Sequence, residues 1–270
     1  MTVSLLSFNV AAQCLRALQK KRPLVHCLTN EVVQELTANV LSCAGASPAM
    51  VVDETEAREF AAIADALLIN LGTPTPQRVK AMLAAIHSAN EHHRPWVLDP
   101  VAAGVIPSRD KLIGELLALK PTAIRANASE ILAIAGQGQG GQGVDSLNTS
   151  DDALPSAQRL ARELHTIVCV TGETDYITDG ERVLATQGGH PIAQVFVGTG
   201  CSLSALVAAF LGTTPTLEAV ATACLMAKMA ARYAVLQMSG MGSFVNYYLE
   251  GLYTIKPDSL IVSGSCDATN

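Results

Sequence analysis

Charge is scarce in this sequence of 270 residues: charged residues make up 16% of it, whereas hydrophobic residues make up 49%. Such a composition is ample for the large core of an α/β domain. A surface poor in charge also indicates that other subunits cover part of it. The formal net charge is -6 and no basic cluster occurs. Nucleic-acid binding is therefore not expected, because it needs a cationic footprint.

Cysteine pairs of the C-x-x-C type are missing as well, although the sequence has seven cysteines. An odd number without such pairs argues against a disulfide framework and a zinc site, and favours reduced thiols in the cytoplasm. The first twelve residues have no positively charged segment before their apolar residues, which argues against a signal peptide. Glycines and Pro215 interrupt the long uncharged stretch at 190–217, so no membrane span is expected.

Short β-like runs alternate with helical segments along the chain. Strands are predicted at 23–28, 49–52, 66–71, 96–98, 122–125 and 166–171, with a hairpin at 176–178 and 182–186. Helices are predicted at 31–43, 55–64, 76–91, 109–119, 129–135, 151–164, 201–211, 217–237 and 244–253. This alternation predicts an α/β fold whose mostly parallel sheet carries helices on both faces. No repeat or linker divides the chain, so we expect one domain over 1–270.

Glycines gather in two places. The string GQGQGGQG at 136–143 is predicted to be a surface insertion, because no strand precedes it and no Lys-Ser/Thr pair ends it. The stronger signal is VGTGCSLSA at 197–205, where Gly198 and Gly200 precede an apolar helix. Free amides and the dipole at such a helix start favour phosphate, and would lower the pKa of Cys201. The alternative is an ordinary turn with a buried cysteine, and this string alone does not separate the two.

Three further motifs follow predicted strands. Asp99, in LDPVAAG, could hold magnesium or only cap its turn. In RANASE, Arg125 could clamp phosphate and Glu130 could hold a magnesium-bound water, although this string is also an ordinary capping box. Thr171, in VTGETD, could face a nucleotide phosphate or simply begin a hairpin turn.

The motif VHCLTNEVVQ holds Asn30, which could cap the next helix or bind a ligand. His26 is expected in the core or an interface, and Met50, inside a short strand, is more typical of core than of a ligand wall. Apart from Met50, all these motifs are read as lying just after a predicted strand. They are therefore expected along the one edge of the sheet where ligands bind.

The strings PLVHCLTNEVV, MVVD, INLGT, LDPVAAG, RANASE, VTGETDYI and VGTGCSLSA, in this order, resemble the hydroxyethylthiazole kinase family of thiamine salvage. The resemblance runs over roughly 25–235. It implies a three-layer ribokinase-like fold, cytoplasmic homotrimers with active sites between subunits, and ATP-dependent phosphorylation of the hydroxyl of 5-(2-hydroxyethyl)-4-methylthiazole.

The resemblance also implies roles for single residues. The thiazole alcohol would be contacted by Asn30, Val32, Met50 and Gly198. ATP would be bound by Arg125, Thr171 and Gly200. Mg²⁺ would be organised by Asp99 and Glu130. Cys201 stands where many ribokinase-like enzymes carry the aspartate that deprotonates the alcohol. Some members of the hydroxyethylthiazole kinase family have a cysteine at this position. The loop 198–200 would be the anion hole.

Other functions stay open from the sequence. A related kinase could act on a pyrimidine or pyridoxine alcohol, and a substrate panel would separate it. A non-catalytic nucleotide-binding regulator on the same fold would bind ligand without turning over ATP. A purely structural α/β protein would bind no nucleotide.

Overall fold

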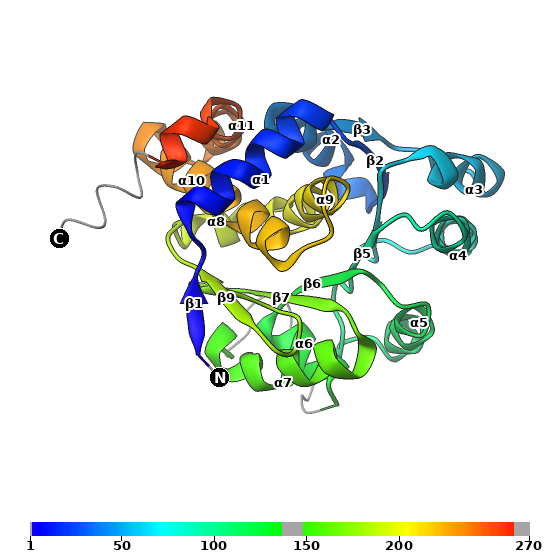
Figure 1. The fold of residues 1–270 in the computed structure, drawn as a ribbon. Coiled ribbons are helices and arrows are strands. Elements are labelled where there is room, and N and C mark those ends of the chain that lie inside the picture. Colours follow the sequence, from blue (N-terminus) through cyan, green and yellow to red (C-terminus); the bar gives the residue numbers. More distant parts are fainter. Residues whose placement is uncertain (1, 137–147, 262–270) are drawn as a thin grey trace.

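The computed structural model describes residues 2–136 and 148–261 (Figure 1). The glycine-glutamine segment predicted to be a surface insertion lies outside this range from residue 137 onward. All described strands join one sheet.

The sheet has nine strands within the described residues, in the order β1-β9-β8-β7-β6-β5-β4-β2-β3. They are β1 Val3–Leu5, β2 Leu24–Leu28, β3 Ser47–Ala49, β4 Ala66–Asn70, β5 Trp96–Asp99, β6 Ala123–Asn127, β7 Ile167–Thr171, β8 Asp175–Thr178 and β9 Val183–Thr186. Only β8 runs antiparallel to its neighbours β7 and β9, as the predicted hairpin requires. The mostly parallel sheet predicted from the alternating pattern is confirmed.

Helices cover both faces of the sheet and make three layers (Figure 1). One face carries α1 Phe8–Lys21, α2 Gln34–Ala44, α9 Thr199–Leu211, α10 Leu217–Gln237 and α11 Phe244–Thr254. The other carries α3 Glu54–Ile63, α4 Pro76–Glu91, α5 Pro107–Leu117, α6 Ala128–Ile134 and α7 Ser150–Leu164. The described chain also has three short helices, η1 Glu31–Val33, α8 Ile192–Val195 and η2 Met241–Ser243, and a helical stretch at 257–261.

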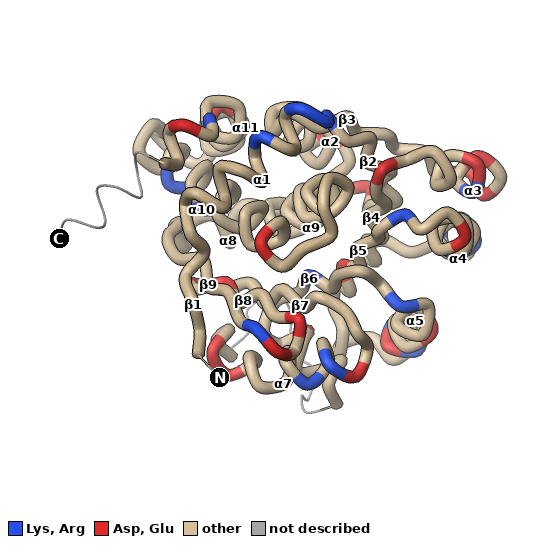
Figure 2. Tube along the Cα trace, in the orientation of Figure 1, with Lys and Arg blue, Asp and Glu red and all other residues tan. Residues whose placement is uncertain are grey.

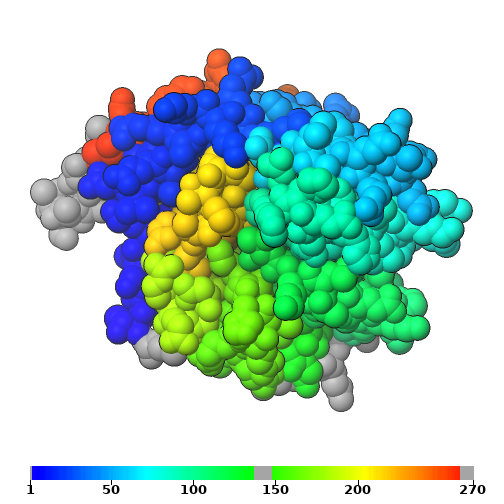
Figure 3. Space-filling model, turned by 45° about the vertical axis from the view of Figure 1, so that its right-hand side comes forward, coloured from blue at the N-terminus to red at the C-terminus, as the bar shows by residue number. Residues whose placement is uncertain are grey.

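Helices α9 and α10 are apolar because they lie inside the fold. Figure 2 shows an almost uncharged trace for α9, while charges gather on the outer helices α3, α4, α5 and α7. Figure 3 shows the yellow α9 region enclosed between the blue N-terminal part and the green middle of the chain. By length and composition α10 could cross a membrane, yet 61% of its most apolar window is buried inside the fold. Core packing accounts for its hydrophobicity.

Most predicted boundaries differ from the structure by one or two residues, and two of the differences have a visible cause. The strand predicted at 49–52 ends at Ala49, since the carbonyl of Val51 bonds to the His26 ring at 2.8 Å rather than to a neighbouring strand. Met50 therefore lies just after a strand, not inside one. Helix α3 begins one residue early because the Asp53 carboxylate, not Thr55, caps it through the N–H groups of Thr55 and Glu56.

Four elements were not predicted: β1, α1, α8 and η2. Helix α1 buries an apolar stripe of Ala11, Leu15 and Leu18, a spacing that was present in the sequence. Strand β1 has only three residues, all of them exposed, and pairs with β9 at the edge of the sheet. Helix α8 has four residues, none of them buried, so neither element carries a hydrophobic pattern that sequence reasoning could detect.

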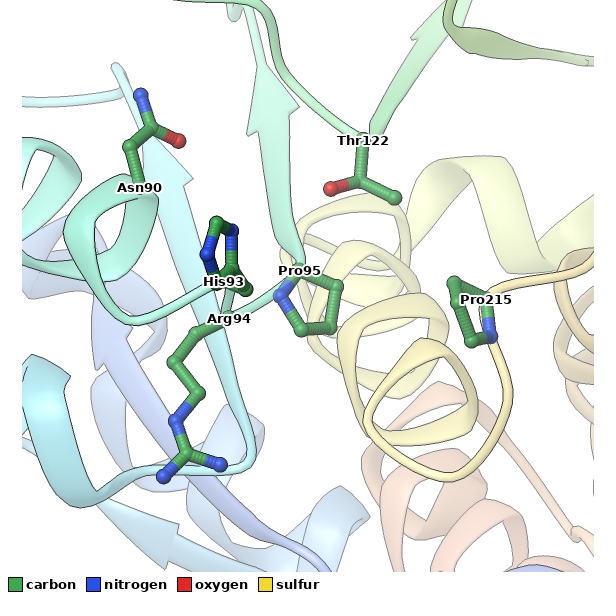
Figure 4. Close-up of a pocket in the computed structure, with 6 residues that line it drawn as sticks. All are labelled: Asn90, His93, Arg94, Pro95, Thr122 and Pro215. Atoms are coloured by element: carbon green, nitrogen blue, oxygen red, sulfur yellow. The ribbon is translucent and has the colours of Figure 1, made fainter.

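The amino ends of the parallel strands lie at the edge of the sheet opposite to the carboxyl ends, where the predicted site residues are found. A shallow pocket of about 260 Å³ lies at these amino ends, close to the starts of β5 and β6 (Figure 4). Its lining residues are Asn90, His93, Arg94, Pro95, Thr122 and Pro215. None of the predicted site residues belongs to it, because they all lie toward the other edge.

Candidate active site

The carboxyl ends of five parallel strands gather the polar residues of the site. Asn30 follows β2, Asn70 ends β4, Asp99 ends β5, Arg125 lies near the end of β6, and Thr171 ends β7. The register places Asn70 beside Asp99 on neighbouring strands. The sequence prediction that Asn30, Asp99, Arg125 and Thr171 share one edge of the sheet is confirmed.

Asp99 is almost completely buried, with 1% of its surface exposed. Its Oδ2 accepts hydrogen bonds from Asn70 Nδ2 and from the Ser204 hydroxyl of α9, both at 2.7 Å. Burial raises the pKa of Asp99 to about 6, although the nearby Arg125 charge opposes the rise. Within the described residues no hydrogen bond reaches Oδ1. One carboxylate oxygen is thus fixed and the other is available to a cation.

Arg125 presents an incompletely paired guanidinium to the same space. Its Nη2 donates to the Thr171 hydroxyl at 2.6 Å, and its Nε is buried without a hydrogen-bond partner among the described residues. Burial, the largest single effect, would lower the pKa of Arg125, but the Asp99 carboxylate together with Glu130 and other nearby groups outweighs it and the net shift is upward. The side chain therefore stays charged, and its free donors suit an anion with several oxygens.

The glycine turn lies directly against this guanidinium. A Cβ on Gly200 would come within 2.9 Å of Arg125 Nη1. Gly198 caps α9 with φ +100°, and a Cβ there would lie 2.8 Å from Val33 Cγ1 of η1. The free N–H groups at the start of α9 thus lie beside Arg125, an arrangement whose chemistry would suit an anion. Contrary to expectation, the turn follows helix α8 and not a strand.

Asn30 serves as both a cap and a contact. Its Oδ1 accepts from the Val32 N–H at 3.1 Å, which caps η1. Its Nδ2 donates to Asn70 Oδ1 at 2.9 Å and to Cys201 Sγ at 3.5 Å. The capping role anticipated from the sequence is present, and the same amide joins Cys201 to the polar edge of the sheet.

Cys201 does not have the lowered pKa that its position in the first helical turn predicted. Burial, followed by the charge of Asp99, raises the pKa of the thiol to about 11. Removal of the thiolate from water outweighs the helix dipole and the hydrogen bonds that would favour it. The side chain is a thiol at neutral pH.

Glu130 forms the capping box that was the alternative reading of its motif. Its Oε2 accepts from the Asn127 N–H and its Oε1 from the Ala102 N–H, both at 3.0 Å. Each oxygen keeps a further lone pair, so the cap does not prevent contact with a metal-bound water. The Glu130 charge also contributes to the raised pKa of Asp99, which places both carboxylates in one electrostatic site.

The sequence model of the hydroxyethylthiazole kinase family matches residues 15–258. The chain belongs to this family. The hydroxyethylthiazole kinase of Escherichia coli O81 (strain ED1a) is 52% identical over 256 residues, which cover 94% of this chain and 98% of that protein. The solved structure of the hydroxyethylthiazole kinase protein from Pyrococcus horikoshii OT3 is 36% identical with a TM-score of 0.86, covering 94% of this chain and 96% of that chain.

A more distant structure supports the fold alone. A ribokinase-like superfamily protein from Enterococcus faecalis V583 is 13% identical with a TM-score of 0.70, covering 96% of each chain. The ribokinase-like fold and the hydroxyethylthiazole kinase family expected from the sequence strings are therefore confirmed.

Two residues to which the family resemblance assigns substrate contacts lie at the margin of the site. Val32 is 70% exposed. Met50 is half-buried and packs against the core cluster beneath α2 and α9. His26 is fully buried, with its pKa lowered mainly by burial and its ring edge-on to Phe60, so the expected core histidine is confirmed.

Sequence reasoning missed an ion pair beneath the turn that follows Thr171. Lys228 of α10 donates to the carbonyls of Gly172 and Glu173, both at 2.9 Å, and pairs with Asp175 at 3.2 Å. Both side chains are largely buried, at 11% and 4% exposure. A lone lysine in the apolar string 219–231 was the available signal, because a buried lysine needs a partner.

Asn70 and Ser204, the two residues that hold Asp99, were also missed. Asn70 stands in the string INLGT, which was read only as a family block, and Ser204 stands in an apolar helix. Their importance comes from the pairing of β4 with β5 and from the packing of α9 on the sheet, neither of which a local string reveals.

Proposed function

We propose that this hydroxyethylthiazole kinase family member transfers the γ-phosphate of ATP to the hydroxyl of hydroxyethylthiazole. The observation that carries the proposal is the convergence of the Arg125 guanidinium, the Asp99 carboxylate and the amino end of α9 around Asn30 and Cys201. An anion site, a metal-binding carboxylate and a polar pocket for an alcohol are the parts that a small-molecule kinase needs.

In this site phosphoryl transfer depends on positioning and on stabilisation of charge. The loose transition state spreads negative charge over the equatorial oxygens of the phosphoryl group. We assign those oxygens to Arg125 and to the free N–H groups at Gly200 and Cys201, which are fixed before the reaction and need no rearrangement. The Thr171 hydroxyl, held by Arg125 at 2.6 Å, would contact an ATP phosphate.

Mg²⁺ is the metal that we assign to Asp99 and Glu130. No cluster of three or more potential metal ligands occurs in the described part of the chain, which fits an ion that is held by one or two carboxylates, water and substrate phosphates. The unbonded Oδ1 of Asp99 and the spare lone pairs of Glu130 suit such an ion. When bound, it would neutralise phosphate charge.

The acceptor alcohol would lie against the contacting side chains of Asn30 and Cys201, with Gly198 at its edge and Met50 and Val32 toward the outside. Both donors of the Asn30 amide are bonded, to Asn70 and Cys201, but its Oδ1 has a second lone pair that can accept a hydrogen bond from a hydroxyl. Cys201, a thiol at neutral pH, would hold the hydroxyl in place rather than remove its proton.

We also propose that the chain forms homotrimers with sites at the subunit interfaces. Val32 and the flanks of the glycine turn, Val195 and Val197, are each about 70% exposed, and Gly198 packs on Val33, which brings the two segments together. A neighbouring subunit would cover this apolar surface and close the pocket over Val32. Light scattering on purified protein measures the mass: a trimer is expected, and a monomer at assay concentration contradicts the proposal.

The cytoplasm is the compartment that we propose. The six cysteines of the described residues are all free, and cysteines persist in this form in a reducing compartment.

The test of the function is release of ADP, measured with a coupled assay in the presence of hydroxyethylthiazole, with and without Mg²⁺. We expect alcohol-dependent turnover that requires Mg²⁺. Hydroxymethylpyrimidine and pyridoxine alcohols run in parallel, and faster turnover with either would favour a related kinase instead. Binding of ATP without turnover of any alcohol would favour the regulator.

A further inference from the structure

A chain of buried hydrogen bonds joins the proposed alcohol pocket to the proposed metal site. Asn30 Nδ2 donates to Asn70 Oδ1 at 2.9 Å, and Asn70 Nδ2 donates to Asp99 Oδ2 at 2.7 Å. The three side chains are 5%, 1% and 1% exposed. At its outer end, Asn30 also reaches Cys201 Sγ. Asn70 is therefore the middle of a path from the acceptor alcohol to the carboxylate.

The amide of Asn70 can point only one way. Its Oδ1 accepts from the backbone N–H of Gly72 at 3.0 Å as well as from Asn30. A backbone N–H can only donate, so this atom must be the amide oxygen. The NH₂ group then faces Asp99, whose Oδ2 must accept. The fixed backbone at Gly72 thus determines the orientation of all three side chains.

Gly72 also makes room for the chain. A Cβ at this position would lie 2.5 Å from the Cβ of Asn30, a distance that would force Asn30 away from Asn70. The absence of a side chain at Gly72 and the presence of an amide at Asn70 serve the same arrangement.

We propose that Asn70 is a positioning residue that orients Asn30 toward the acceptor alcohol and Asp99 toward the metal. This inference rests on the proposed function. Asn70 contacts its two neighbours through different atoms, Asn30 through Oδ1 and Asp99 through Nδ2, so its loss has two separable consequences: weaker binding of the alcohol and a higher requirement for Mg²⁺. A residue that merely filled space in the core would produce neither.

The test measures two quantities on the full chain: KM for hydroxyethylthiazole and the Mg²⁺ concentration that gives half-maximal rate. For Asn70→Ala we expect both to rise and kcat/KM to fall about 10- to 100-fold, as is usual when a group that holds a metal-binding carboxylate is removed. In an Asn30→Ala background, Asn70→Ala should raise the Mg²⁺ requirement again but leave KM for the alcohol unchanged. Equal effects on KM in both backgrounds would overturn the proposal.

Asn70→Asp separates the two bonds in another way. It keeps the size and the oxygen that Asn30 and Gly72 bind, but replaces the donor facing Asp99 with a second acceptor. We expect its Mg²⁺ requirement to rise by a larger factor than its KM for the alcohol. The control is Asn90→Asp near the amino ends of the strands (Figure 4), where the amide also has a partner on each side: Nδ2 donates to the Leu119 carbonyl and Oδ1 accepts from the Trp96 ring N–H. Its kinetic constants should match those of the wild type.

The outcomes keep the two proposals apart. Wild-type protein that turns over no hydroxyethylthiazole contradicts the proposed function, and calorimetric titration of Mg²⁺ in the presence of ATP then still tests the bond to Asp99. Active wild type together with a folded Asn70→Ala variant of unchanged KM and unchanged Mg²⁺ requirement contradicts the Asn70 proposal alone. Melting curves of each variant establish that it is folded.

Discussion

Replacement of Cys201 tests whether this site needs a general base. With a pKa of about 11, roughly one thiol in 10⁴ is ionised at neutral pH, which corresponds to about 5 kcal/mol at 1.36 kcal/mol per pKa unit. General-base help typically raises a rate by about 10²–10⁴-fold. The scarcity of thiolate therefore cancels the most that a base at this position could supply. We expect Cys201→Ala to lower kcat by less than about tenfold, through loss of contact with the alcohol.

The pH dependence of the rate shows whether the Cys201 thiolate acts as a base. Below the pKa of the thiol, the thiolate population rises tenfold for each unit by which the pH increases. If the thiolate were the base, the rate would therefore climb steeply between pH 7 and pH 9. We expect no such climb in the wild type, and steady-state rates over this range in wild type and Cys201→Ala provide the measurement. A tenfold rise per unit that disappears in Cys201→Ala would falsify the reasoning.

Cys201→Asp is the complementary variant. Burial and the charge of Asp99, which raise the pKa of the cysteine, would raise the pKa of an introduced aspartate as well. Its basic form is lost as pH falls, so we expect activity equal to or above the wild type at pH 8 and a steeper decline toward low pH. Inactivity at every pH in a folded protein would remove position 201 from the neighbourhood of the hydroxyl.

Three further changes have defined outcomes. Arg125→Ala removes the charged donor of the anion site, so kcat should fall about 10²–10³-fold with a raised KM for ATP; an unchanged rate would take Arg125 out of the site. Gly200→Ala places a methyl group against Arg125 Nη1 and should lower kcat/KM for ATP by up to about 10²-fold at a nearly unchanged melting temperature, whereas a rate equal to the wild type would show that the guanidinium moves freely. Lys228→Met leaves Asp175 buried without its cation, so urea unfolding should show a loss of about 3–5 kcal/mol that Asp175→Asn partly restores, and a loss under 1 kcal/mol would contradict a buried pair.

The long periodic elements were predictable from sequence. Helices α4 and α10 were predicted with the residue bounds that the structure shows, because Thr75 and Thr216 cap their first turns and long apolar patterns follow. Short elements such as β1 and α8 were not, since they bury no apolar stripe and depend on the rest of the fold for their position.

The candidate site was predictable where a charged residue stands at or near the end of a strand, because few structural roles explain a charge at that position. Asp99 and Arg125 were found in this way. Asn70, Ser204 and Lys228 were not, because each acts through a partner distant in sequence. The ionisation of Cys201 was mispredicted, since a local string shows the helix start but not the burial that outweighs it.

The proposed mechanism requires that Arg125 and the amino end of α9 together hold the phosphoryl group during transfer. A crystal structure with Mg²⁺, ADP, aluminium fluoride and hydroxyethylthiazole tests it directly, because the planar fluoride mimics that group. We expect fluorides within hydrogen-bonding distance of the Arg125 guanidinium and of the N–H groups of Gly200 and Cys201, with the alcohol beside Asn30. A fluoride group bound elsewhere, with Arg125 still paired only to Thr171, would contradict the claim.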